Sequence, residues 1–156
     1  MAVMKDPFNR PILRTGLFYP DPDAALVFLQ AAFGFARHMV VRDRDGKLMH
    51  AEIKFGDAEI VVDSEWADFV SCPNALNGKN TQLIYIQLQD GLDAHCANAR
   101  ANGADIIEPP QDQIYGDRTY RAKDIGGHIW TFSQAVKIVT REDAEKAGDM
   151  TIEGWF

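Results

Sequence analysis

In the first half of the chain, hydrophobic residues recur at the two-residue spacing of a strand in some segments and at the spacing of a helix in others. Residues 12–19 have the pattern of a strand, and residues 21–35 repeat apolar side chains at helical spacing. Asp21 is suited to cap this helix, Pro22 to occupy its first position, and Gly34 to end it. The sequence therefore predicts a strand followed by a capped helix.

Strand-like runs follow, and then the same order begins again. Three runs occupy residues 36–43, 47–55 and 58–63, separated by short turn segments. The second half predicts a strand over 81–89, a helix that opens at Asp90 and closes at Gly103, and strands over 104–110, 117–123 and 128–134. Thr140 and Asp143 fit a capping box, which predicts a short helix in the tail.

Matching landmarks of the two halves are separated by a constant interval. Asp90 lies 69 residues after Asp21, and Gly103 lies 69 residues after Gly34. This period predicts two copies of one β-α-β-β-β unit. Each copy is too short to be stable by itself, so we expect one α+β domain over 1–156, with unit one at about 10–64, unit two at about 81–134 and a tail at 135–156.

Composition and charge restrict the partners. The formal net charge is −7, and the 16 Lys and Arg residues are scattered along the 156 residues, so we expect neither nucleic acid nor a membrane surface as a partner. The amino-terminal residues lack the apolar region of a secretory signal, which predicts a cytoplasmic protein. Cys72 and Cys96 lack metal-binding spacing, and Cys96 is expected in the core.

The repeat, together with the motifs HAEIKFGD at 50–57 and YGDR at 115–118 and the GHxW pattern from Gly127, resembles the vicinal oxygen chelate superfamily. This is the glyoxalase, bleomycin-resistance and extradiol-dioxygenase group, and its PhnB-like branch is the most similar. The resemblance implies curled mixed sheets that form a cup, a pocket inside it, and a homodimer. It also implies a divalent metal held by four positions, two on each unit.

Registering the chain on its landmarks places four residues at those positions, none of which is a metal ligand of the expected kind: Arg14, Val61, Leu83 and Thr131. We therefore expect no metal cofactor. A guanidinium at Arg14 would suit a carboxylate or phenolate of a ligand instead. These expectations favour a protein that binds a small aromatic or anionic molecule, with these contacts: Arg14, Tyr85, Trp66, Tyr115, Arg118, Trp130 and Thr131.

Alternatives remain open. His50 and Glu52 share one face of a strand, so they are candidates for acid-base catalysis in a lyase, isomerase or dioxygenase, or for a relocated divalent metal site completed by His128. A further alternative is a closed cup, with function residing in the dimer or tail surface. His95 is expected to be a solvated surface residue.

Overall fold

The computed structural model describes residues 4–155, and these form two compact units that meet in sequence at Lys79 and Asn80. Each unit has one four-stranded mixed sheet and the predicted β-α-β-β-β order. The predicted α+β class and its tandem repeat are confirmed.

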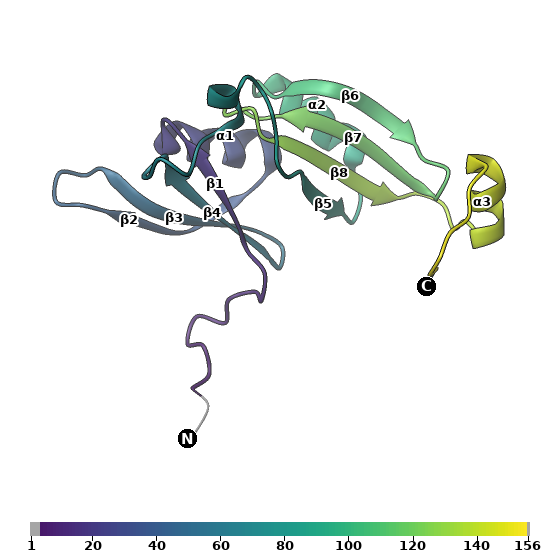
Figure 1. Ribbon diagram of the computed structural model, residues 1–156, viewed down its shortest axis with the longest axis horizontal. Helices are drawn as coiled ribbons and strands as arrows, with labels where there is room; N and C mark the ends of the chain where they lie inside the picture. The colour runs from purple at the N-terminus through teal and green to yellow at the C-terminus, as the bar shows by residue number, and fades with distance from the viewer. Residues whose placement is uncertain (1–3, 156) are drawn as a thin grey trace. The chain divides into compact units, whose positions relative to one another are not determined.

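The first unit builds its sheet in the order β1-β4-β3-β2 (Figure 1). β1 runs parallel to β4, and the other neighbouring pairs are antiparallel. A short 3-10 helix, η1, follows the sheet. The elements are β1 (Thr15–Tyr19), α1 (Pro22–Phe33), β2 (Ala36–Arg42), β3 (Leu48–Phe55), β4 (Ala58–Ser64) and η1 (Pro73–Leu76).

The second unit repeats this topology in the order β5-β8-β7-β6. Gly16 pairs with Val61 in the first unit, and Tyr85 pairs with Thr131 in the second, as the sequence interval predicts. The elements are β5 (Ile84–Leu88), α2 (Leu92–Ala101), β6 (Asp105–Asp112), β7 (Asp117–Lys123), β8 (Ile129–Ala135) and α3 (Arg141–Gly148).

Two of the three predicted helix starts are confirmed in detail. The Asp21 side chain accepts a hydrogen bond from the Ala24 backbone N–H, and Gly34 adopts a left-handed conformation at the end of α1. Thr140 accepts a hydrogen bond from the Asp143 N–H at the start of α3.

The start of α2 differs from its prediction. Gly91, not Asp90, precedes the first helical residue, and its positive φ of 70° is one that glycine adopts without steric cost. The free N–H of Leu92 donates to the side chain of Gln134 on β8, 2.9 Å away. The capping acceptor is thus supplied by a distant strand, which a local pattern does not reveal.

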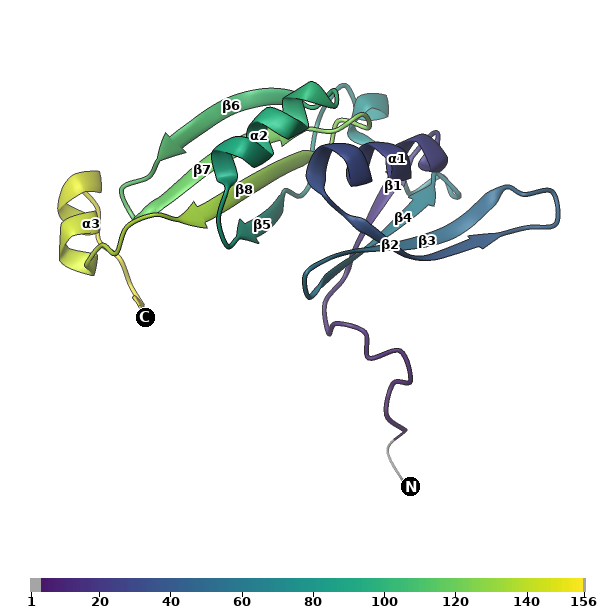
Figure 2. The ribbon, with the colours of Figure 1, turned by 180° about the vertical axis from the view of Figure 1, so that it is seen from behind.

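Helix and sheet pack face to face within each unit. In Figure 2, α1 lies on one face of the first sheet and α2 on one face of the second. Alternate strand residues under the helices form the core, including Leu17, Ile53, Val62, Ile86 and Phe132. The remaining strand residues point to the opposite face, which we call the polar face of each sheet.

The described helices are all too short or too polar to span a bilayer. Both cysteines are free and buried, and Cys96 packs in the core as predicted. Burial raises the pKa of the Cys96 thiol, which disfavours its reactive thiolate form.

Candidate functional site

The polar face of the first sheet holds a compact group of charged side chains. One guanidinium nitrogen of Arg14, Nη1, lies 2.9 Å from Glu52 Oε1 and 2.7 Å from Glu59 Oε1. Both carboxylates are buried, and the Arg14 side chain retains about a quarter of its exposure. Arg14, which was expected to bind an anionic ligand, is already paired with two internal carboxylates.

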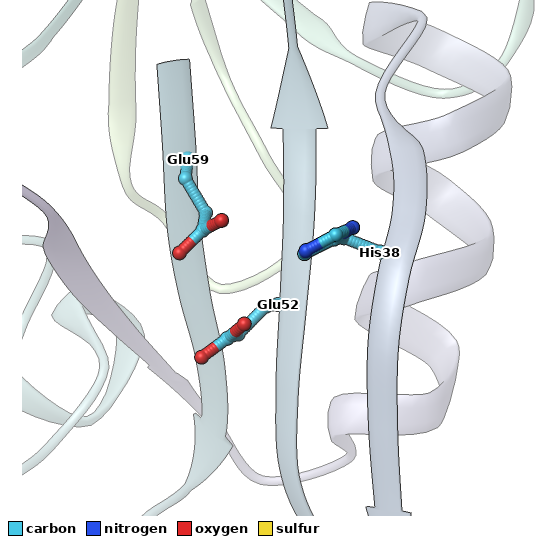
Figure 3. Close-up of side chains that lie close together, drawn as sticks. All are labelled: His38, Glu52 and Glu59. Carbon is cyan, nitrogen blue, oxygen red and sulfur yellow. The ribbon is translucent and has the colours of Figure 1, made fainter. Parts of the chain in front are cut away.

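His38 lies beside this pair of carboxylates. His38, Glu52 and Glu59 come from the neighbouring strands β2, β3 and β4, and possible ligand atoms of all three lie within 4.8 Å of one another (Figure 3). The register of β2 against β3 shifts between Arg37 and Met39, which indicates a bulge at His38. Bulges re-aim side chains, so sequence alternation gave no signal that His38 belongs to this group.

His50 joins the same group from β3. Its Nε2 lies 3.2 Å from Glu52 Oε1, and its Nδ1 lies 3.2 Å from Asp63 Oδ1. The Asp63 contact is not aligned as a hydrogen bond, so this buried oxygen has no hydrogen-bond partner in the described part of the chain. The two catalytic candidates, His50 and Glu52, are therefore in contact, and Asp63 on β4 is a further neighbour.

Burial and charge act in opposite directions on these carboxyl groups. Burial raises the pKa of Glu52, but the hydrogen bonds from His50 and Arg14 together bring that pKa below its ordinary value. Burial is the largest effect on Asp63 and leaves its pKa raised. The hydrogen bond to Glu59 is the main cause of the raised pKa of Arg14, which stays charged.

The polar face of the second sheet carries aromatic and hydroxyl groups in the corresponding place. Tyr85 is 66% exposed and pairs with Thr131, which in turn pairs with Arg121. Arg121 donates from Nε to the Thr131 hydroxyl at 3.1 Å and from Nη1 to Glu108 at 2.6 Å. Arg121 was not singled out in the sequence, although it lies 69 positions after Glu52 and occupies the equivalent place in the repeat.

Tyr115 lies near this surface, in the turn between β6 and β7. It is 47% exposed, and burial of the phenol, followed by the nearby Asp117 and Tyr85, raises its pKa. Gly116, the next residue, has a φ of 100°, and a Cβ there would come within 2.2 Å of the Lys137 carbonyl oxygen. A glycine is therefore required to hold the turn that presents Tyr115.

Other predicted contact residues have different surroundings. Trp130 has no exposed surface, and its indole N–H donates to Asp124 in the core. Arg118, paired with Asp93 and Asp112, lies on the surface. Trp66 is 61% exposed and packs edge-on against Phe69. Leu83, one of the four residues that the sequence matched to the metal-ligand positions, is 40% exposed.

The two remaining histidines, His95 and His128, are both shielded from solvent at least in part. His95 was expected at the surface, but its Nδ1 lies 2.6 Å from the hydroxyl of buried Tyr120, and its ring contacts Phe132. That prediction was wrong because the residue faces the sheet from α2. His128 is buried in the β7–β8 turn, where its backbone N–H donates to Asp124.

A surface pocket of about 460 Å³ lies in the first unit, between the amino-terminal segment and the β3–β4 turn. Arg10 and Lys54 are among its lining residues. Arg10 is paired with Asp6, and Lys54 Nζ lies 3.7 Å from Glu59 Oε2, so the pocket adjoins the charged group described above.

Residues 12–132 match the model of the Glyoxalase/Bleomycin resistance protein/Dioxygenase superfamily. The chain belongs to this superfamily. TioX from Micromonospora sp. ML1 is 30% identical, with a TM-score of 0.64, and the match covers 83% of this chain and 100% of TioX. An uncharacterised protein of Mycobacterium tuberculosis is 27% identical over 141 residues, covering 88% of this chain and 82% of its own.

A more distant solved structure shows the same fold. The fosfomycin resistance protein FosX from Mesorhizobium loti is 13% identical, with a TM-score of 0.57, and the match covers 80% of this chain and 91% of FosX. At this level of identity the similarity concerns the fold alone, since one fold hosts many activities.

Proposed function

We propose that this superfamily member binds a small aromatic or partly anionic molecule on the polar face of its second sheet, without a metal at the family positions. The supporting observation is Tyr85, which exposes 66% of its surface on the edge strand β5 of that sheet. An exposed aromatic ring near a guanidinium offers stacking and hydrogen bonding to one ligand.

Arg121 replaces Arg14 as the cation in this proposal. Arg14 is engaged by two carboxylates, so it adds little attraction for an anion. Arg121 uses Nε and Nη1 in its bonds to Thr131 and Glu108, and its Nη2 has no hydrogen bond to the described residues. This nitrogen remains available to a carboxylate or phenolate.

The test is a binding titration with salicylate, 4-hydroxybenzoate and a panel of aromatic antibiotics, in which the intrinsic fluorescence of the protein reports binding. Tyr85→Ala should weaken binding by about fivefold, because a stacking contact contributes roughly 1 kcal/mol. Arg121→Met should weaken the anionic ligands selectively. Phe8→Ala, which removes a 64% exposed ring from the amino-terminal segment, is the matched control. Equal binding by Tyr85→Ala and the parent protein would contradict the proposal.

The enzymatic alternative is a lyase, isomerase or dioxygenase reaction that uses His50 and Glu52 or a divalent metal away from the family positions. The proximity of His38 to Glu52 and Glu59 favours it, because imidazole and carboxylate are the donors that catalytic metals use. Incubating a bound aromatic ligand with the protein, with and without Mn²⁺, separates the two functions. A changing ligand absorption spectrum indicates turnover, and a constant one leaves binding alone.

The homodimer and the PhnB-like assignment stay predictions. Sedimentation velocity at several protein concentrations measures the first directly. A monomer at every concentration would exclude a dimer-based function.

A further inference from the structure

We propose that His38, Glu52 and Glu59 form a divalent-cation site on the first sheet, and that Arg14 competes with the cation for the two carboxylates. The inference is independent of the aromatic-ligand proposal, which concerns residues of the second sheet. The site differs from the family positions, which fall on Arg14, Val61, Leu83 and Thr131.

The donor set and its geometry support a cation. One imidazole and two carboxylates from three adjacent strands place their possible ligand atoms within 4.8 Å of one another (Figure 3). Mn²⁺, Co²⁺, Ni²⁺ and Zn²⁺ all accept such mixed nitrogen and oxygen ligands. The three strands are hydrogen-bonded neighbours, so the donors are held by a rigid part of the fold.

An unsatisfied atom provides a second, independent observation. The Glu59 side chain has no exposed surface, and its Oε2 accepts no hydrogen bond from the described residues. The nearest cation to Oε2 is Lys54 Nζ, 3.7 Å away, which is too far for a hydrogen bond. A buried carboxylate oxygen without a partner is costly, and a coordinated cation would remove that cost.

Arg14 explains how the carboxylates are held before a cation binds. Both of its hydrogen bonds to them come from Nη1, and the residue lies one position before β1, with 26% of its side chain exposed. Because the side chain is partly exposed, it can turn outward into solvent. Because guanidinium and metal repel each other, binding of one opposes the other.

The experiment uses the full chain, dialysed against chelator and titrated calorimetrically with Mn²⁺, Co²⁺, Ni²⁺ and Zn²⁺. At least one metal should bind the parent protein with a stoichiometry of about one. Glu59→Gln and His38→Ala should each weaken it by tenfold or more, since even an outer partner of a metal ligand contributes that much. Arg14→Met should tighten it by about tenfold. Glu142→Gln, an exposed change in α3, is the control.

A measurement on the parent protein avoids any folding defect of the variants. Mn²⁺ should broaden the amide resonances around His38, Glu52 and Glu59 at substoichiometric concentration and leave those of α3 sharp. If no metal binds the parent protein with a dissociation constant below about 1 mM, the proposal is overturned, even if the Arg14→Met variant binds one. Binding that His38→Ala and Glu59→Gln leave unchanged, or broadening elsewhere in the chain, also overturns it.

Discussion

Arg14 Nη1 lies 2.7 Å from Glu59 Oε1, and this single nitrogen also contacts Glu52, so two buried carboxylates share one guanidinium. The position that the resemblance assigns to a metal ligand thus carries a positively charged side chain. This relationship connects the stability of the first sheet with its capacity to bind a metal.

Removing Arg14 should destabilise the protein. Arg14→Met leaves two buried carboxylates without their guanidinium, and we expect the free energy of unfolding to fall by about 2 kcal/mol, less than for a fully buried pair because Arg14 is partly exposed. Urea unfolding measures this change. Arg10→Met, which breaks the exposed pair with Asp6, should have a much smaller effect. Equal losses in the two variants would show that the Arg14 pairs are not special.

Asp124 should be essential to the β7–β8 turn. It is buried and accepts hydrogen bonds from the backbone N–H groups of Gly126 and His128 and from the Trp130 indole. Asp124→Ala leaves three donors without their acceptor, so we expect a loss of about 2–4 kcal/mol in thermal or chemical unfolding.

A matched control exists in the β2–β3 turn. Asp43 accepts from the N–H groups of Asp45 and Lys47 with the same spacing, but it is exposed to solvent. Asp43→Ala should therefore change stability by less than about 1 kcal/mol. A comparable loss at Asp43 would mean that turn formation, rather than burial, determines the cost.

Tyr120 should contribute through its hydroxyl group. The side chain is 1% exposed, burial raises its pKa, and its hydroxyl bonds to His95. Tyr120→Phe should lower the free energy of unfolding by about 1 kcal/mol. Tyr85→Phe, at an exposed position, should stay within about 0.5 kcal/mol of the parent protein. Full stability of Tyr120→Phe would argue against the His95 bond.

Glu65 should make stability depend on pH in the acid range. The N–H of Cys72 and the hydroxyl of Ser71 donate to its carboxylate and lower its pKa below 4.5. Because the folded-state pKa is the lower one, the stabilisation is present above pH 4.5 and is lost as pH falls through the folded-state value.

The corresponding measurement compares Glu65→Gln with the parent protein between pH 7 and pH 3. The difference between their free energies of unfolding should be less than about 1 kcal/mol at pH 7, because the Glu65 side chain is exposed. It should shrink toward pH 3. A difference that is constant with pH would exclude the charge of Glu65 as its source.

The sequence determined the repeated strand-helix-strand order, because hydrophobic period and helix caps are local properties. Asp21, Gly34 and Thr140 act as predicted, since each interacts with residues a few positions away. The same local reasoning failed at Asp90 and His95, where Gln134 and Tyr120 on distant strands supply the partners.

The tertiary structure alone decided which charged residues meet. Sequence spacing placed His50 and Glu52 on one face, but strand pairing added Glu59 and Asp63, a bulge added His38, and Arg14 was brought to the same carboxylates from β1's amino-terminal side. Long-range register determines these contacts, and the energy of a buried charge depends on all its neighbours at once. A one-dimensional pattern specifies which face a side chain occupies, but not the ion pair that it forms there.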